Sequence, residues 1–174
     1  KPQEPAPRDR LPTAAEIEAL AHVAGDDLST ATGRAFHAFR FACETAMRAG
    51  EICGLTWANV DLERRVAHLP MTKNGTARDV PMTAAAVELL RPLVGRDPVF
   101  GLSSAQLDAL FRKIKAKAMI KGLTFHDSRA YALTALARKV DVLTLAKISG
   151  HRDLRILSNT YYRESAEDIA QRLD

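Results

Sequence analysis

The stretch from residue 66 to residue 82 reads Val-Ala-His-Leu-Pro-Met-Thr-Lys73-Asn74-Gly75-Thr-Ala-Arg-Asp-Val-Pro-Met, and its pattern differs from the rest of the chain. Both ends of the stretch are short strand-like runs with apolar and β-branched side chains. Asn74-Gly75 between them is a pair that tight hairpin turns prefer, because both central positions of such a turn need a positive φ. The stretch therefore predicts an antiparallel β-hairpin, and we expect it to be the only sheet of the protein.

Helical patterns lie on both sides of this hairpin. Thr13 and Glu16 form a capping box that begins the first helix. After the hairpin, Thr83 is expected to cap one helix that extends to Val94, and Ser104 another that closes at Gly122. The other helices are expected over 35–46, 127–138 and 142–149, after Asp153 and after Ser165. The sequence thus predicts a mainly α fold with one small antiparallel β-sheet, of the α+β class.

The pattern divides the 174 residues into three parts. Residues 1–12 contain four prolines and are expected to form an extended linker. Residues 13–163 have the length of one globular domain, since the chain is short for two domains. Residues 164–174 are expected to form an amphipathic tail helix, opened by Ser165-x-x-Asp168.

Composition favours a cytoplasmic protein without a membrane-bound part. No apolar run approaches the roughly 18 residues that a membrane span needs, and the polar N-terminal stretch has no signal-peptide pattern. Cys43 and Cys53 show no metal-binding or disulfide spacing, so we expect both to be small core residues in a reducing compartment. The 25 Lys and Arg residues exceed the 21 acids and give a net charge of +4, which weakly favours a polyanionic partner.

Three separated fragments carry the residues best suited to chemistry. They read Glu44-Thr-Ala-Met-Arg48-Ala-Gly-Glu51, His126-Asp-Ser-Arg129 and Ser149-Gly150-His151, the last followed by Tyr161-Tyr162-Arg163. With Lys73 in the hairpin turn, their order and approximate spacing resemble the Arg, Lys, His-x-x-Arg, Gly-His and Tyr series of the tyrosine recombinase, or phage integrase, family. The resemblance covers nearly the whole chain after the linker, and it implies the catalytic-domain fold of that family for residues 13–163.

The resemblance also implies an activity, namely site-specific DNA recombination through a covalent 3′-phosphotyrosine. Such a bond conserves the energy of the cleaved phosphodiester, so religation needs neither ATP nor a metal ion. The sequence shows no P-loop and no clustered metal-ligand spacing. We therefore expect no cofactor.

Individual roles follow from the charge that develops during attack on a phosphodiester. The transition state gathers negative charge on the non-bridging oxygens, and the guanidinium groups of Arg48 and Arg129 offer permanently charged, planar sets of donors for them. The resemblance implies that His126 accepts the nucleophile's proton and that His151 donates a hydrogen bond to the phosphate. Lys73, on the hairpin turn, can protonate the departing 5′ oxygen as general acid.

The nucleophile is expected to be Tyr161, with Tyr162 as a competitor. Tyr161 lies ten residues after His151, one more than is usual in the family, and Tyr162 lies one further. Ser128 and Ala130 also depart from the residues that the family usually has beside its second arginine. Glu51 resembles the family's acidic residue near the first arginine and is expected to orient that guanidinium, although it also suits the start of a helix.

Each of these residues has an ordinary structural interpretation as well. Arg48 suits a capping charge, Gly150-His151 a helix end, and Lys73 a turn. His126 and Arg129 lie three apart and can simply share a helix face, and the two tyrosines can anchor a final helix on the core. Their conjunction in the order of one family is what favours the catalytic interpretation.

The expected partner is double-stranded DNA, held by its backbone. The candidate DNA-binding residues are Arg112, Lys113, Lys115, Lys117, Lys121 and Arg152, with Arg155 beside them. The family's N-terminal core-binding domain has no counterpart here. The resemblance therefore implies a fragment that is monomeric alone and a longer protein, bacterial or phage-encoded and associated with the nucleoid, that forms a homo-tetramer on paired sites. The alternatives are a non-catalytic DNA-binding module and a type IB topoisomerase, which uses the same chemistry without site specificity.

Overall fold

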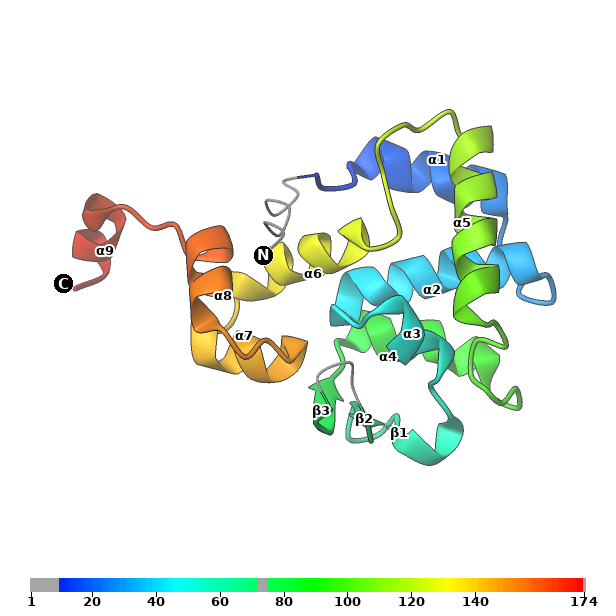
Figure 1. Ribbon diagram of the computed structural model, residues 1–174, viewed down its shortest axis with the longest axis horizontal. Coiled ribbons are helices and arrows are strands. Elements are labelled where there is room, and N and C mark those ends of the chain that lie inside the picture. Colours follow the sequence, from blue (N-terminus) through cyan, green and yellow to red (C-terminus); the bar gives the residue numbers. More distant parts are fainter. Residues whose placement is uncertain (1–9, 72–74, 174) are drawn as a thin grey trace, which may run out of the picture.

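Helix α2 (Ala31–Thr45) lies at the centre of the computed structural model, which describes residues 10–71 and 75–173 (Figure 1). Nine of its 15 residues are buried, because other helices pack on several of its sides. Its partners are α1 (Ala14–Ala24), α4 (Ala84–Leu90), α5 (Ser104–Lys117) and α6 (Asp127–Ala137). The fold class predicted from the sequence, mainly helical with a small antiparallel sheet, is confirmed.

Helix starts follow the capping chemistry, with two corrections. The second helix begins at Ala31 instead of Ala35, because the side chain of Thr30 accepts a hydrogen bond from the Gly33 amide and caps it. The N-cap of α5 is Ser103, not Ser104, because Ser103 and Gln106 form the capping box. This helix also ends at Lys117, before Gly122.

Two further features were missed. Helix α4 ends at Leu90 and continues as the 3₁₀ turn Arg91–Leu93, so its expected extension to Val94 is wrong; Pro92 has no amide hydrogen to continue the α-helical pattern. The short helix α3 (Ala49–Cys53) was not predicted. The last three helices were, and they are α7 (Val142–Ser149), α8 (Leu154–Tyr161) and α9 (Ala166–Leu173).

The sheet has three antiparallel strands in the order β1-β2-β3, at one side of the protein (Figure 1). The predicted hairpin is formed by β2 (Val66–Leu69) and β3 (Arg78–Pro81), whereas β1 (Val60–Asp61), reached after the 3₁₀ turn Trp57–Asn59, was not predicted. Residues 72–74, in the turn between β2 and β3, lie outside the described part of the chain. Ala67, Leu69 and Val80 are buried on one face, as the two-residue period of strands requires.

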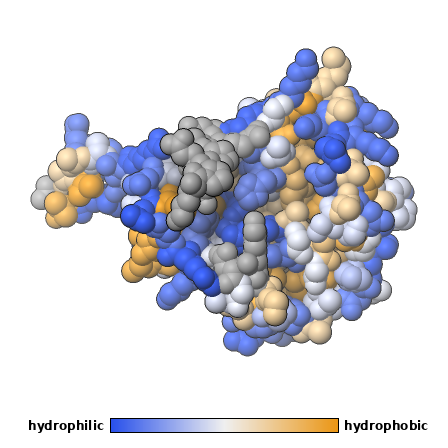
Figure 2. Space-filling model, in the orientation of Figure 1, coloured by the Kyte–Doolittle hydropathy of each residue, from blue (hydrophilic) through white to orange (hydrophobic). Residues whose placement is uncertain are grey.

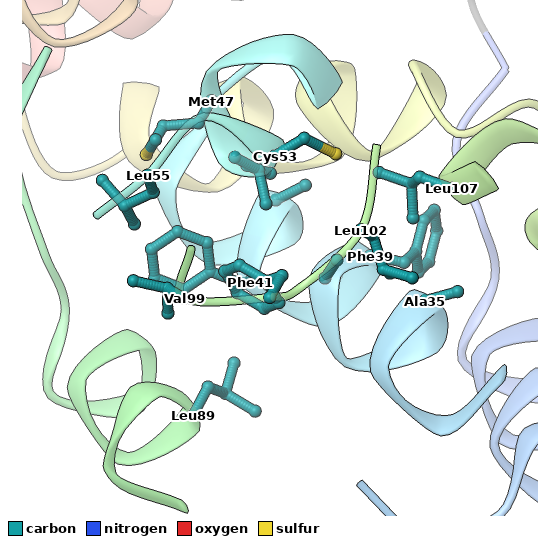
Figure 3. Close-up of a cluster of buried hydrophobic side chains, with 14 of the residues drawn as sticks. Ala35, Phe39, Phe41, Met47, Cys53, Leu55, Leu89, Val99, Leu102 and Leu107 are labelled. Carbon is teal, nitrogen blue, oxygen red and sulfur yellow. The ribbon is translucent and has the colours of Figure 1, made fainter. Parts of the chain in front are cut away.

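The main hydrophobic core lies between α2 and the helices around it. Phe39 is fully buried and stacks on Phe111 of α5, with ring centroids 4.8 Å apart. The ring of Phe125 meets that of Phe39 edge-on, with ring centroids 5.7 Å apart. Figure 3 shows Phe39 and Phe41 surrounded by side chains from α3 and from the segment 99–102. Ile52 and Cys53 are the buried residues of α3 in this core, so the same packing fixes α3, and the arginine at its start, against α2. Cys43 and Cys53 are free thiols beside or within this core, as predicted.

A second, smaller core holds the C-terminal helices together. Its buried members are Ala46, Ala132, Leu133, Leu145 and Leu157, with Tyr161 and Tyr162 partly buried against it. Ala46 follows α2 in the left-handed conformation with φ of 57° and so joins the central helix to this second core. The space between the two cores is where the polar residues described below meet.

Helix α9 lies apart from both cores (Figure 1). Its side chains Ile169 and Leu173 are 41% and 79% exposed, and Figure 2 shows hydrophobic surface at this end of the protein. Ser165 and Asp168 form the predicted cap at its start. Among the described residues, no helix is both long and apolar enough to cross a membrane.

The aromatic packing predicts a large effect of truncating Phe39. Replacing this ring with alanine removes its contacts with Phe111 and Phe125 and leaves a cavity, so Phe39→Ala should lower the free energy of unfolding by about 3–5 kcal/mol. Urea denaturation followed by circular dichroism measures the change. Leu143→Ala is the control, because that side chain is 59% exposed, and a similar loss in both variants would contradict the packing described here.

Candidate active site

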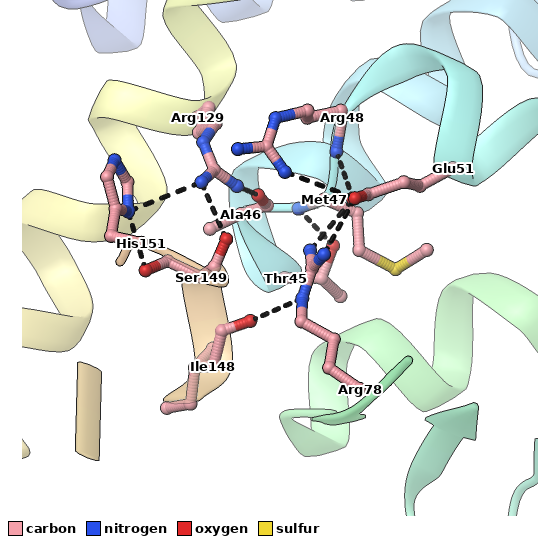
Figure 4. Close-up of polar contacts among 10 residues, drawn as sticks. All are labelled: Thr45, Ala46, Met47, Arg48, Glu51, Arg78, Arg129, Ile148, Ser149 and His151. Atoms are coloured by element: carbon pink, nitrogen blue, oxygen red, sulfur yellow. Dashed lines mark hydrogen bonds and ion pairs between the residues drawn. The ribbon is translucent and has the colours of Figure 1, made fainter. Parts of the chain in front are cut away.

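Arg129 is the most constrained of the predicted site residues. It lies on α6 and is only 4% exposed. Its guanidinium donates hydrogen bonds to the carbonyls of Ala46 and Ser149, the latter at 2.7 Å, and lies 3.4 Å from Nδ1 of His151 (Figure 4). Burial first, and then the nearby charges of Arg48 and Arg78, lower the pKa of Arg129 to about 9. The group therefore stays charged at neutral pH in surroundings that favour an added anion.

Arg48 lies at the start of α3, immediately after the buried residue Met47. Its backbone amide donates to Oε2 of Glu51 at 2.9 Å, and its Nη1 lies 3.2 Å from Oε1 of the same carboxylate. The expected role of Glu51 in orienting Arg48 is thus matched by direct contacts. The Arg48 side chain remains 23% exposed, so part of its guanidinium faces outward.

Arg78 is a third arginine of the site, and the sequence interpretation missed it. It lies on β3 and binds both oxygens of Glu51, at 2.7 and 2.8 Å (Figure 4). Its Nε also donates to the carbonyl of Ile148 at 3.1 Å. A signal was present, because Arg78 lies two residues before Val80 and so shares the buried face of the strand.

His151 follows the left-handed Gly150, which ends α7 with φ of 76°. Its Nδ1 lies 2.7 Å from Oγ of Ser149 as well as 3.4 Å from Nη2 of Arg129. Since arginine can only donate, Nδ1 is best placed as an acceptor, which leaves the proton on Nε2. Burial first, and then the charge of Arg129, lower the pKa of His151 to about 4, so the neutral ring offers one donor at neutral pH.

A cavity of about 220 Å³ opens between α3 and α6. Arg48, His126 and Arg129 line it together, with Asp108 of α5 at its edge. His126 is exposed, and its charge contributes to the lowered pKa of His151. The structure thus brings both arginines and His126 to one cavity that has room for a phosphate group, and His151 adjoins it through its contact with Arg129.

The two tyrosines differ in their surroundings. Tyr161 ends α8; burial raises its pKa, and the charge of Arg129 partly offsets that rise. The hydroxyl of Tyr162 instead donates to the carbonyl of Val140 at 2.7 Å, and the pKa of this residue is raised by burial and by the charge of Asp141. Tyr161 is therefore the tyrosine that interacts with the arginine cluster.

The remaining predicted residues that the structure describes do not gather at the cavity. Lys73 lies outside the described residues. Arg112, Lys113, Lys117 and Lys121 are exposed along or just beyond α5, although Arg112 pairs with Asp108 at 3.0 Å. Lys115 is half-buried and donates to the carbonyl of Leu123 at 2.7 Å. Arg152 lies elsewhere, in a separate groove that Lys147, Arg78 and His151 also line. In the described part of the chain, no group of three or more His, Cys, Asp or Glu side chains could hold a metal ion.

Comparisons with known proteins agree with this arrangement. Residues 11–168 match the model described as the Phage integrase family. A protein of Haemophilus influenzae described as an integrase/recombinase is 48% identical over 179 residues, which cover 99% of this chain and 59% of that protein. The chain therefore spans less than two thirds of that relative.

Two solved structures share the fold. The Tn1549 transposon integrase in complex with transposon right end DNA gives a TM-score of 0.75 at 19% identity, covering 98% of this chain and 67% of that one. The λ integrase catalytic core gives a TM-score of 0.66 at 20% identity, covering 84% of this chain and 94% of that one. The helical architecture with its small sheet is thus that of a known catalytic core.

The position of His151 predicts an unusual titration. In an NMR titration of the free protein, its ring should protonate near pH 4, well below the ordinary value of 6.5. Saturating inorganic phosphate should raise this midpoint, because an anion beside the ring stabilises the imidazolium. A midpoint near 6.5 in the free protein would contradict the burial and charge described above.

The same shift has a consequence for stability. Between pH 6.5 and 4 the unfolded chain binds a proton at His151 that the folded protein does not. The contribution of His151 to the free energy of unfolding is therefore present above pH 6.5 and is lost as the pH falls toward 4. Denaturation of His151→Gln across this range should show a shallower pH dependence than the unaltered protein.

The two tyrosine hydroxyls should differ in their contribution to stability. Tyr162→Phe removes the hydrogen bond to Val140 and should lower the free energy of unfolding by about 1 kcal/mol. Tyr161→Phe should have a smaller effect, since no hydrogen bond joins the Tyr161 hydroxyl to a described residue. The reverse order in thermal and urea denaturation would show that the two side chains have been assigned to the wrong surroundings.

Proposed function

Because this chain belongs to the Phage integrase family, we propose that it is the catalytic domain of a site-specific tyrosine recombinase, which cuts and rejoins DNA through a covalent 3′-phosphotyrosine. One observation carries the proposal. Arg48 and Arg129, which are 81 residues apart in the sequence, line the same phosphate-sized cavity as His126. Two guanidinium groups at one small cavity are suited to a phosphodiester, which carries its negative charge on two non-bridging oxygens.

In the proposed reaction, the Tyr161 oxygen attacks the scissile phosphorus and the bond to the 5′ oxygen breaks. Arg48 and Arg129 hold the non-bridging oxygens, and the Nε2 proton of His151 is available to one of them. His126 accepts the proton of Tyr161. Lys73 gives a proton to the departing 5′ oxygen, and reversal of the same steps rejoins a strand without ATP, because the phosphotyrosine keeps the energy of the broken bond.

The pKa shifts support different roles for Tyr161, Arg129 and His151. Burial raises the pKa of Tyr161, so the free protein keeps its nucleophile protonated. The charge of Arg129 acts in the opposite direction and would stabilise the phenolate during attack. The neutral ring of His151 can donate without adding a further cation to the cluster.

Double-stranded DNA is the proposed partner. Exposed cations on and after α5, together with Arg152, would bind the phosphate backbone and give a salt-sensitive, mostly sequence-independent affinity. Lys115 contributes less than its neighbours in this proposal, because it already holds the Leu123 carbonyl. The relative described as an integrase/recombinase comes from a bacterium, and we propose a location in the bacterial cytoplasm, at the nucleoid.

Assembly on DNA is proposed for the full-length protein. Helix α9 exposes Ile169 and Leu173 and lies apart from both cores, so it is suited to pack on a neighbouring subunit within a homo-tetramer. The chain described here is proposed to be monomeric by itself.

Covalent capture tests the function directly. The full-length protein is incubated with a randomised pool of nicked DNA duplexes, and a protein–DNA adduct that survives denaturation is isolated and mapped by mass spectrometry. We expect the adduct on Tyr161, its loss in Tyr161→Phe, and its retention in Tyr162→Phe.

The other outcomes are equally informative. An adduct on Tyr162 would overturn the choice of nucleophile but leave the recombinase chemistry. Binding of the pool without any adduct would favour a non-catalytic DNA-binding module. Adduct formation without enrichment of any sequence would favour a type IB topoisomerase.

A further inference from the structure

We propose that Arg78 is a positioning residue of the active site, which occupies the carboxylate of Glu51 and so keeps the guanidinium of Arg48 available for a phosphate. This inference rests on the proposed function, since it concerns the phosphate that Arg48 would bind.

The contact distances show how Glu51 divides its interactions. Arg78 forms two parallel hydrogen bonds with it, at 2.7 and 2.8 Å, whereas Nη1 of Arg48 reaches only Oε1 and lies 3.2 Å away. Parallel pairs of this kind are the strongest arrangement that a carboxylate and a guanidinium can form. Glu51 is therefore held mainly by Arg78, and Arg48 keeps most of its donors free.

Burial strengthens this division. The side chains of Arg78 and Glu51 are 9% and 7% exposed, but that of Arg48 is 23% exposed. Burial raises the pKa of Glu51, but the hydrogen bonds from the Arg78 side chain and the Arg48 backbone amide, together with the charges of both arginines, lower it further, so the carboxylate is ionised at neutral pH. Without Arg78, this buried charge would have Arg48 as its nearest cation, and the pair would neutralise each other.

The charge balance of the cluster shows the consequence. Arg48, Arg78 and Arg129 carry three positive charges, and Glu51 supplies one negative charge. The carboxylate of Asp108, which also lines the cavity, is paired with Arg112 at 3.0 Å. The excess is available to an anion in the cavity that Arg48 and Arg129 line. Removing Arg78 would reduce this excess and also turn Arg48 toward Glu51.

A second contact fixes Arg78 in this position. Its Nε donates to the carbonyl of Ile148, and its side chain packs over Gly150, where an added Cβ would lie 3.2–3.4 Å from the guanidinium and its neighbouring carbon. Gly150 thus serves both the left-handed turn before His151 and the place of Arg78. The hairpin strand is tied in this way to the segments that carry Arg48 and His151.

Phosphate binding to variants of the Arg78–Glu51 pair tests the inference. The variants are Arg78→Gln, Glu51→Gln and the double variant, with inorganic phosphate as the probe and its dissociation constant measured by NMR at fixed ionic strength. Arg78→Gln should bind phosphate about tenfold more weakly, the size expected for losing one charge-assisted interaction. The double variant should recover most of this loss, because the carboxylate that would capture Arg48 is gone.

A matched control comes from the surface pair of Arg91 and Glu88. These residues also form an arginine–glutamate pair, with a distance of 2.8 Å, but they are 57% and 68% exposed and lie at the end of α4 and in the 3₁₀ turn that follows it. Arg91→Gln should leave phosphate binding unchanged. Thermal unfolding of each variant separates a loss of binding from a loss of folding.

Each result decides the proposal. It is overturned if Arg78→Gln binds phosphate as tightly as the unaltered protein, or if the double variant binds no better than Arg78→Gln, which is the behaviour of a purely structural ion pair. If Arg78→Gln does not fold, Arg78→Lys with and without Glu51→Gln is read in the same way, because lysine keeps the charge but cannot form the parallel pair.

Failure of the inference and failure of the proposed function can be told apart. If the unaltered protein does not bind phosphate, this inference falls with the phosphate site itself, and the adduct assay then reports on the function independently. If the unaltered protein binds phosphate and the variants do not differ, only the role of Arg78 is wrong.

Discussion

The buried guanidinium of Arg129 is the interaction on which the rest of the site depends. It holds the carbonyl of Ala46, at the end of the central helix, and the carbonyl of Ser149, at the end of α7. Each carbonyl lies at the C-terminal end of its helix, where the last backbone carbonyls need hydrogen-bond donors from outside the helix. One side chain therefore satisfies two helix ends and joins the main core to the C-terminal one.

A buried charge with only neutral partners is costly, and the site limits this cost in two ways. The carbonyl dipoles solvate Arg129, and the carboxylate of Glu51 compensates part of the positive charge of Arg48 and Arg78. Burial first, and then the positive charges that remain uncompensated nearby, lower the pKa values of Arg129 and His151. Fixed donors with uncompensated positive charge are the property that electrostatic stabilisation of an anionic transition state requires.

The surrounding architecture explains how residues far apart in the sequence come to lie in one cluster. The main core fixes α3 and α5 on the central helix, and the smaller core fixes α6, α7 and α8 relative to one another. The sheet places Arg78 between these two units. Helix α9 lies apart from both cores and contributes no side chain to the cluster.

The sequence by itself determined the secondary structure and the types of chemical group. Capping residues such as Thr13 and the hairpin pattern of residues 66–82 act over a few residues, so local rules predicted α1 and the pairing of β2 with β3. The same rules missed β1, which has only two residues, and misplaced the start of α5 by one position. Arg48, His126, Arg129 and His151 were named because their order resembles that of one family, and the structure brings them together.

Only the tertiary structure decided what each group interacts with. Three of these interactions join segments that are distant in the chain. Arg78 binds Glu51, the Tyr162 hydroxyl donates to the carbonyl of Val140, and Tyr161 lies near the charge of Arg129. The pKa of His151 depends equally on burial, which no local pattern encodes. Local propensity reflects interactions within a turn or a hairpin, whereas electrostatic surroundings are set by how whole helices pack, and that is why the sequence named the groups and the fold assigned their partners.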